Sequence, residues 1–170
     1  MLKMKPVTLV RAAERNWSTL LLIERSVSGT KLYHATVNRA EFEKEFENDI
    51  RYLVGCGVDT VGMVMYKKRT SAITHISALA IKPQWQGRGV GRAIMSFLLQ
   101  KLAGIPQLEV VVHPENTRAV NLYQSLGFEI AARHENYFGD GEPRVLFVKL
   151  NKGVKKHISA TLRPKRTVVL

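Results

Sequence analysis

Gln86-Gly87-Arg88-Gly89-Val90-Gly91-Arg92 stands between an apolar segment that ends at Pro83 and an amphipathic segment that ends at Gly104. This pattern predicts a strand that passes through a tight glycine turn into a helix. Glycine accepts positive φ and lets other groups approach, and the first turn of a helix presents unpaired N–H groups at the positive end of its dipole. With Arg88 and Arg92 beside these groups, we predict an anion site, most naturally for a pyrophosphate. The alternative is a turn that only reverses the chain.

Outward from this turn, the hydrophobic pattern predicts an α/β domain with a mixed sheet of about seven strands and about four helices. Antiparallel strands come first, and a β-α-β crossover lies in the middle. The expected strands cover residues 7–13, 51–57, 60–68, 72–81, 108–113, 128–138 and 144–150. The expected helices cover residues 16–25, 39–50, 89–102 and 116–126, and Asn38 is expected to cap the second. We expect residues 1–151 to form the domain and residues 152–170 to form a basic C-terminal tail.

Composition narrows the class of protein. The chain has 170 residues, 45% of them hydrophobic and 24% charged, which suits one globular domain and excludes a disordered or collagen-like chain. No apolar run approaches the ~20 residues that span a membrane. The single cysteine, Cys56, excludes an internal disulfide, so we predict a cytoplasmic protein. No His, Cys and carboxylate cluster has metal-ligand spacing, so we predict no metal.

The charge balance predicts anionic partners. The chain holds 26 Lys and Arg against 14 Asp and Glu, a formal net charge of +12. Such a charge favours nucleic acid, the ribosome, an acidic peptide or a phosphate-bearing cofactor, or it serves solubility alone. Six of the cations and no acid lie in the tail: Lys152, Lys155, Lys156, Arg163, Lys165 and Arg166.

Two motifs together resemble one family. The pattern Gln86-x-x-Gly89-x-Gly91 is similar to the Q/R-x-x-G-x-G/A signature of the GNAT superfamily, the acetyl-CoA-dependent N-acyltransferases. Residues 113–128, His-Pro-Glu-Asn-Thr-Arg-Ala-Val-Asn-Leu-Tyr-Gln-Ser-Leu-Gly-Phe, resemble its second motif, and the element order fits from residue 7 to about residue 150. The resemblance implies a GNAT-type fold, in which a mixed sheet splays open between the parallel strands 72–81 and 108–113. Acetyl-CoA, the implied cofactor, would lie in that V.

The resemblance also implies roles for single residues. The backbone of one strand would pair with the pantetheine arm, the glycine turn would wrap the pyrophosphate, and the following helix would contribute further contacts. The implied cofactor-binding residues are Leu79, Ala80, Ile81, Gln86, Gly87, Arg88, Gly89, Val90, Gly91, Arg92, Asn116, Ala119 and Tyr123. Tyr123 lies two helical turns after Asn116 on the same face, and the family places a tyrosine there as general acid for the departing thiolate. The simpler alternatives are a helix N-cap for Asn116 and a core aromatic for Tyr123.

Within the superfamily the chain resembles the protein N-terminal acetyltransferases of the ribosomal-protein-alanine type. Asn136-Tyr137-Phe138 and the strand 144–150 carry this resemblance. It implies that Tyr137 and Phe138 hold the first residues of the acceptor, whereas the alternative is that they end a strand and pack on the sheet.

The chain lacks the residue that acts as general base in that branch. Transfer to an amine needs a neutral nitrogen, and the bacterial members carry a glutamate on the fifth strand where this chain has Val111. Counting back from Gln86, His75 falls where other members carry a base on the fourth strand, and histidine titrates near neutrality. Glu109, on the same side of its strand as Val111, is the second candidate, and His113, just before the expected cofactor-contact segment, is a weaker third. An inert strand histidine is the alternative for His75.

The sequence therefore predicts an N-acetyltransferase in which an amine attacks the thioester of acetyl-CoA directly. The expected acceptor is a protein or peptide N-terminal α-amino group, with a ribosome-associated protein among the candidates. Two alternatives stay open: a small-molecule amine acetyltransferase, and a basic nucleic-acid- or ribosome-binding module that retains the cofactor fold.

Overall fold

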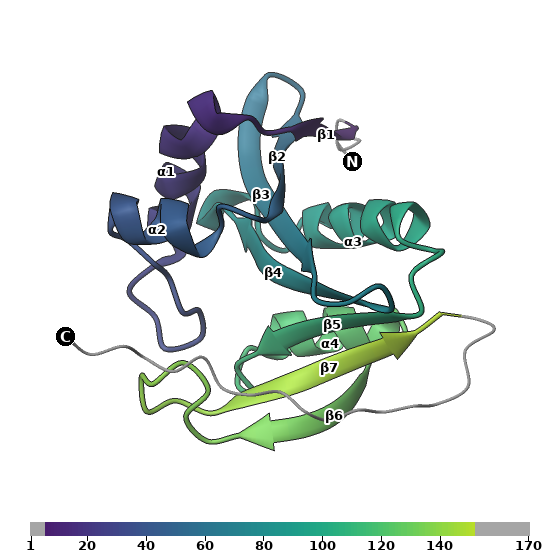
Figure 1. The fold of residues 1–170 in the computed structure, drawn as a ribbon. Coiled ribbons are helices and arrows are strands. Elements are labelled where there is room, and N and C mark those ends of the chain that lie inside the picture. Colours follow the sequence, from purple (N-terminus) through teal and green to yellow (C-terminus); the bar gives the residue numbers. More distant parts are fainter. Residues whose placement is uncertain (1–5, 152–170) are drawn as a thin grey trace.

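The computed structural model describes residues 6–151, so the predicted tail, residues 152–170, lies outside the described residues. One mixed sheet runs in the order β1-β2-β3-β4-β5-β7-β6 (Figure 1). Its strands are β1 (Val7–Arg11), β2 (Ile50–Cys56), β3 (Asp59–Lys68), β4 (Ile73–Ile81), β5 (Gln107–Val112), β6 (Glu129–His134) and β7 (Arg144–Leu150). The α-helices are α1 (Trp17–Val27), α2 (Arg39–Glu45), α3 (Val90–Lys101) and α4 (Thr117–Ser125). The predicted mixed α/β fold is confirmed.

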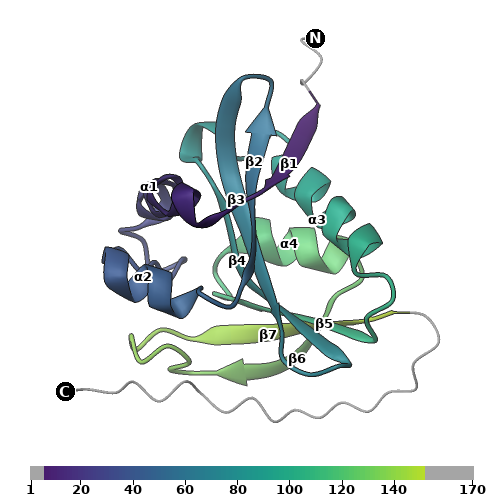
Figure 2. The same ribbon diagram turned by 45° about the horizontal axis from the view of Figure 1, so that its top comes forward.

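The helices cover both faces of the sheet (Figure 2). One core cluster joins α1 and α2 to one face of β3 and β4 and includes Leu20, Phe42 and Ala80. A larger cluster joins α3 and α4 to the other face and includes Ile94 and Tyr123. Burial on both faces explains why the central strands read as nearly continuous apolar runs. No helix among residues 6–151 has the length and apolar character to cross a bilayer.

The sheet opens between its two parallel strands. β4 pairs with β5 only from Ile73, opposite Gln107, to Ile76, opposite Val110. Beyond that point β4 runs on to Ile81 without a partner on its β5 side, while β5 pairs with β7 on its other edge along its whole length. The backbone groups on the inner edge of β4 therefore face a gap that a ligand can fill by hydrogen bonding.

A bulge in β4 marks the start of this gap. In the pairing with β3, Met65 stands opposite Ala78 and Tyr66 opposite Ile76, which leaves Ser77 as the extra residue. A bulge reverses the alternation of side chains. Ile76 accordingly packs toward α3, whereas Ala78 packs toward α1 and α2. The bulge thus re-aims the carboxyl half of β4 at the point where β5 leaves it.

Two predicted elements end at least four residues earlier than the sequence indicated. The predicted helix 39–50 ends at Glu45, because the Arg51 guanidinium donates to the carbonyls of Phe46 at 2.8 Å and Glu47 at 3.0 Å and stabilises the helix end there. Ile50 instead begins β2. The predicted strand 128–138 ends at His134, so residues 135–143 form a loop into β7. Asn38 caps α2 as predicted and accepts from the Glu41 N–H at 3.2 Å.

Candidate functional site

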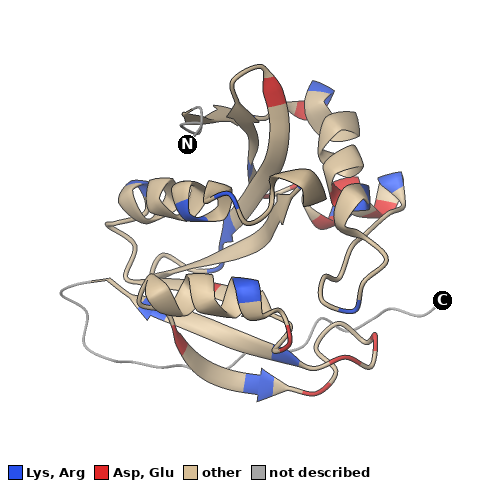
Figure 3. Cartoon of the chain, turned by 180° about the vertical axis from the view of Figure 1, so that it is seen from behind, with Lys and Arg blue, Asp and Glu red and all other residues tan. Residues whose placement is uncertain are grey.

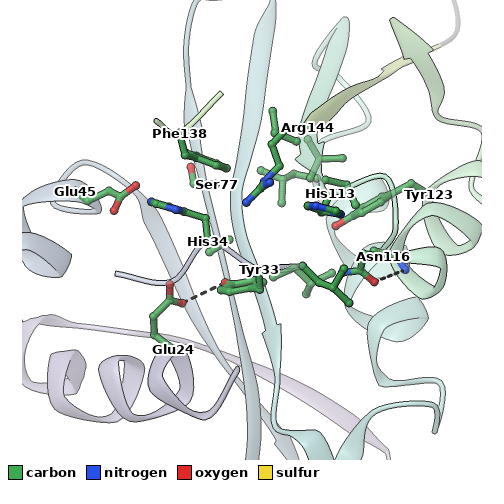
Figure 4. A pocket seen from close by; sticks show the side chains of 18 of the residues that line it. Glu24, Tyr33, His34, Glu45, Ser77, His113, Asn116, Tyr123, Phe138 and Arg144 are labelled. Carbon is green, nitrogen blue, oxygen red and sulfur yellow. Dashed lines mark hydrogen bonds between the residues drawn. The ribbon is translucent and has the colours of Figure 1, made fainter. Parts of the chain in front are cut away.

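A pocket lies where β4 and β5 separate, and it is walled by α1 and the loop after it on one side and by β5, α4 and β7 on the other (Figure 4). Five of the predicted site residues line it: Leu79, Asn116, Ala119, Tyr123 and Phe138. His113, the weakest of the predicted candidates for the base, also lines it, and the other polar residues on its walls were not predicted as site residues: Glu24, Tyr33, His34, Glu45, Ser77 and Arg144. The remaining predicted residues lie along the gap, in the glycine turn or beneath the pocket.

The inner edge of β4 presents a buried polar atom to this pocket. The Ser77 hydroxyl, at the bulge, has no hydrogen-bond partner among the described residues. An unsatisfied buried hydroxyl costs about 1–3 kcal/mol, so such groups usually mark a ligand or water position. Together with the unpaired edge of residues 77–81, it fits an extended ligand rich in amide groups, as a pantetheine arm is.

The glycine turn lies at the outer end of the gap and is exposed. Gly87 and Gly89 have φ of 74° and 84°, a region that favours glycine, and Gly89 is the N-cap of α3. Gln86 braces the turn, because its amide donates to the Ile81 carbonyl at 2.9 Å and accepts from Arg118 on α4 at 2.9 Å. The N–H groups at the start of α3 are therefore presented to solvent beside Arg88, Arg92 and Arg118, an arrangement that fits an anion.

Gly91 sets the packing of the α3 N-terminus. A Cβ at this position would lie 3.3 Å from Ile81 Cδ1 and 3.3 Å from Leu122 Cδ2. Those distances are tight, so glycine lets α3 sit close to both β4 and α4. The distance between α3 and α4 on that side of the gap therefore depends on a glycine at position 91.

α4 supplies the right-hand wall of the pocket in Figure 4. The Asn116 side chain accepts from the Ala119 N–H at 3.2 Å, so its role as helix N-cap is confirmed. Tyr123, two turns later, is 3% exposed and packs edge-on against Phe128. Burial raises the pKa of the Tyr123 phenol well above its usual range, so the hydroxyl stays protonated at physiological pH.

The two predicted bases lie side by side beneath the pocket. His75 and Glu109 are directly opposite each other where β4 and β5 still pair, and neither is among the residues that line the pocket. The Glu109 carboxylate accepts from Gln107 Nε2 at 2.8 Å and from Arg69 Nη1 at 3.4 Å. Arg69 also reaches the Tyr137 hydroxyl at 3.4 Å, so Tyr137 belongs to this buried cluster while Phe138 lines the pocket.

A carboxylate on α1 forms the opposite wall. Glu24 is 1% exposed, and its two oxygens accept from the Tyr33 hydroxyl at 3.1 Å and from the Thr36 N–H at 3.2 Å. Thr36 also donates through its hydroxyl to Glu45 at 2.6 Å. Burial raises the pKa of Glu24 to about 7, and the neighbouring Glu45 adds to the shift. The pocket therefore contains a carboxyl group that exchanges a proton near neutrality.

Contacts between two loops close one side of the pocket. The His34 ring stacks on Phe138 with centroids 4.3 Å apart, and its Nδ1 lies 3.2 Å from Asp140 Oδ2. The buried Arg144 guanidinium donates to the same carboxylate at 2.8 Å and reaches the Lys31 carbonyl at 3.5 Å. The segment after α1 and the β6–β7 loop are thus joined, and an acceptor must enter beside them.

Charge divides between the two helical pairs (Figure 3). α3 and α4 carry Arg92, Lys101 and Arg118 and no acid, whereas α1 and α2 carry charges of both signs and the β6–β7 loop carries three acids and no Lys or Arg. A phosphate-bearing ligand is favoured along the first pair and a cationic amine on the acidic wall of the second. Among residues 6–151 no three His, Cys, Asp and Glu side chains gather as metal ligands would.

Comparison with known proteins gives one family. The model of the Acetyltransferase (GNAT) family matches residues 17–128. The ribosomal protein bS18-alanine N-acetyltransferase of Escherichia coli (strain K12) is 37% identical over 62 residues, which cover 35% of this chain and 42% of that protein. The matched stretch therefore spans less than half of that relative.

Solved structures show the same fold. The ribosomal-protein-S18-alanine N-acetyltransferase from Escherichia coli superposes with a TM-score of 0.74 at 19% identity, over 90% of this chain and 99% of that one. A GNAT family acetyltransferase from Elizabethkingia anophelis with acetyl-CoA bound gives 0.68 at 17% identity, over 85% and 97%.

Proposed function

The chain belongs to the acetyltransferase (GNAT) family, and from the site that it builds we propose that it transfers the acetyl group of acetyl-CoA to an amine. The observation that carries this proposal is the opening between β4 and β5, with a glycine turn at one end and a buried tyrosine at the other. We propose a protein N-terminal α-amino group as the acceptor. A relative whose name gives an alanine N-acetyltransferase of a ribosomal protein supports that acceptor class.

Each part of acetyl-CoA has a counterpart along the gap. The unpaired edge of Leu79, Ala80 and Ile81 would hydrogen-bond the pantetheine arm, and Ser77 offers one more donor at the bulge. The turn from Gln86 to Arg92 would hold the pyrophosphate, with Ala119 and Asn116 of α4 on the facing side. Acetyl-CoA supplies an activated thioester, so the protein has to position it, exclude water and manage protons.

Tyr123 is the proposed proton donor to the departing sulfur. Its raised pKa keeps the phenol protonated, so a hydrogen-bond donor is always present where negative charge develops on the thiolate. Phe138, on the β6–β7 loop, would contact the first residue of the acceptor. The Tyr137 ring packs edge-on against the Phe138 ring, with the two ring centroids 4.8 Å apart. His75 and Glu109 stay predictions as the base, although neither of them lines the pocket.

An acceptor panel tests the proposal. Purified protein and acetyl-CoA would be mixed with a peptide that starts with alanine, with an N-terminally blocked lysine peptide, or with a small diamine, and the released thiol would be measured. We expect release with the first peptide, and release with the diamine alone would favour a small-molecule acetyltransferase. Acetyl-CoA binding by calorimetry without release in any mixture would contradict catalysis, and the absence of binding would contradict the cofactor as well.

A further inference from the structure

An acidic side chain occupies a position on α1 that helical spacing reserves for apolar residues. Leu20, Leu21 and Ile23 of this helix are 0–5% exposed, and Glu24 lies on the same buried side at 1%. No Lys, Arg or His among residues 6–151 forms an ion pair with it. Burying a carboxylate without a cation is costly, so a structural role alone is a poor explanation.

The Glu24 carboxylate is instead fixed by neutral donors at the pocket wall. The Tyr33 hydroxyl and the Thr36 N–H each hold one oxygen, as Figure 4 shows for Tyr33. Tyr33 and Tyr123 both line the pocket, Tyr33 from the segment after α1 and Tyr123 from α4 (Figure 4). The carboxylate is therefore held at the wall of the same pocket that Tyr123 lines, where the acceptor nitrogen and the thioester would meet.

We propose that Glu24, positioned by Tyr33, is the general base that deprotonates the acceptor ammonium. This inference rests on the proposed acetyl transfer and names the group that the transfer requires. Glu109, by contrast, already accepts from Gln107 and Arg69, and with His75 it lies off the pocket wall. The base is thus assigned to the helical side of the pocket and not to the strands.

The proton balance of the reaction can be written in full. The Glu24 carboxylate takes one proton from the ammonium, and the nitrogen lone pair then forms the C–N bond to the thioester carbonyl carbon. The C–S bond breaks with its electron pair on sulfur, which takes a proton from the Tyr123 hydroxyl. The nitrogen's second proton restores Tyr123, and Glu24 releases its proton to solvent, so one amide, one thiol and one proton leave.

The titration of Glu24 suits an α-amino acceptor. Burial raises its pKa to about 7, against the two hydrogen bonds that lower it. An α-amino group has a pKa of about 8 and a lysine side chain about 10.4, so the first gives its proton to this carboxylate far more easily. The ionisable groups that share the pocket are Tyr33, His34, Glu45, His113, Tyr123 and Arg144.

The decisive experiment is the pH profile of kcat/KM on the alanine peptide, from about pH 5.5 to about pH 9. We expect the wild-type value to fall as pH drops through about 7, because the base must be ionised. Glu24→Gln keeps the shape of the side chain and the hydrogen bond from Thr36. In this variant the fall of kcat/KM at low pH, the acidic limb of the profile, should disappear, and the rate should drop about a hundredfold or more. His75→Gln and Glu109→Gln should keep the limb.

Two further variants should move the limb in opposite directions. Tyr33→Phe removes a hydrogen bond that favours the carboxylate, so the limb should shift to higher pH. Glu45→Gln removes a neighbouring negative charge, so the limb should shift to lower pH. A purely structural role would change stability or rate without these opposite shifts.

Controls separate this inference from the proposed function. Acetyl-CoA affinity by calorimetry should stay within about twofold of wild type in Glu24→Gln, which shows an intact fold. If Glu24→Gln keeps both limb and rate, Glu24 is not the base. If the wild type acetylates no amine, the proposed function fails, and carboxyl NMR then tests Glu24 alone. The expected spectrum of the wild type has a carboxyl signal that titrates near pH 7 and that is missing in Glu24→Gln. If no such signal is found, the assignment of Glu24 is overturned.

Discussion

Tyr123 is deeply buried and also lines the pocket, so it can be a proton donor or only a packing residue. The two roles differ in whether its hydroxyl takes part in the reaction. Tyr123→Phe keeps the ring packing on Phe128 and removes only the proton donor. We expect kcat to fall about tenfold or more with acetyl-CoA affinity nearly unchanged, because the hydroxyl acts mainly as charge develops on sulfur. Steady-state kinetics and calorimetry measure the two quantities. Tyr52→Phe, in the core under α3, is the matched control, and equal rates for both variants would make Tyr123 a packing residue.

Glu24 also predicts a pH dependence of stability that needs no substrate. Its pKa is raised from 4.5 to about 7 in the folded chain, so the folded state binds the proton more tightly than the unfolded state. Stability from this group is complete below about pH 4.5 and is lost as pH rises through about 7. The loss amounts to about 3 kcal/mol. Urea unfolding at about pH 5 and about pH 8 should show it in wild type and not in Glu24→Gln. An equal pH dependence in both proteins would contradict the raised pKa.

Single residues also show where sequence reasoning succeeds and where it stops. Asn116 and Tyr123 follow from spacing on one helix, because a local period fixes which residues share a face. Ser77 could not be predicted, since a bulge depends on how β3 and β4 are paired. The one sequence signal for Glu24 is that it is a charged residue within the apolar stripe of α1. Its partners Tyr33 and Thr36 lie in a loop without a periodic pattern, so their contacts with Glu24 could not be predicted.

At the scale of elements, the glycine turn and α3 act as one unit. Gly89 has a φ of 84°, and a β-branched residue is a conformational outlier there. Gly89→Val should therefore displace the first N–H groups of α3 and weaken acetyl-CoA binding about tenfold or more, equivalent to ~1.4 kcal/mol. Calorimetric titration measures this loss. Gly104→Val is the control, since a Cβ there meets no atom within 4 Å and φ is not positive. Unchanged affinity in a folded Gly89→Val protein would remove the pyrophosphate assignment.

Elements with a local cause were predicted well and those set by tertiary contacts were not. α3 and α4 start within a residue of the prediction, because a glycine and an asparagine mark their first turns. α2 was predicted about five residues too long, since the spacing of Phe42, Phe46 and Ile50 suggested a continuing helix. The capping by Arg51, which comes from the next strand, could not be read from that spacing. The early end of β6 likewise depends on its pairing with β7.

For the whole molecule, the basic tail should be separable from the domain. The described core closes at Asn151, whose side chain donates to the Leu102 and Ile105 carbonyls at 3.1 Å and 2.6 Å. Truncation after Asn151 should therefore leave a folded protein with unchanged acetyl-CoA affinity. Binding to a single-stranded RNA oligomer should weaken and lose part of its salt dependence, because six cations are removed. Failure of the truncated chain to fold would instead make the tail part of the domain.

The arrangement of the molecule joins two different half-sites. The glycine turn and the basic helices α3 and α4 lie along the gap between β4 and β5, and the pocket at the separation of these strands has α1 with Glu24 on one wall and α4 with Tyr123 on the other. A phosphate-bearing acyl donor and an amine would therefore approach from opposite sides and meet beside Tyr123. That meeting is the central claim of the proposed chemistry.

The most direct test is to find the nitrogen that receives the acetyl group. Isotope-labelled acetyl-CoA would be incubated with the protein and with a peptide that has both an alanine N-terminus and an internal lysine, and the product would be fragmented in a mass spectrometer. The predicted result is one labelled acetyl group on the α-amino nitrogen, strongly reduced with Tyr123→Phe and with Glu24→Gln. Label on the lysine alone, or no label on the peptide, would contradict the account.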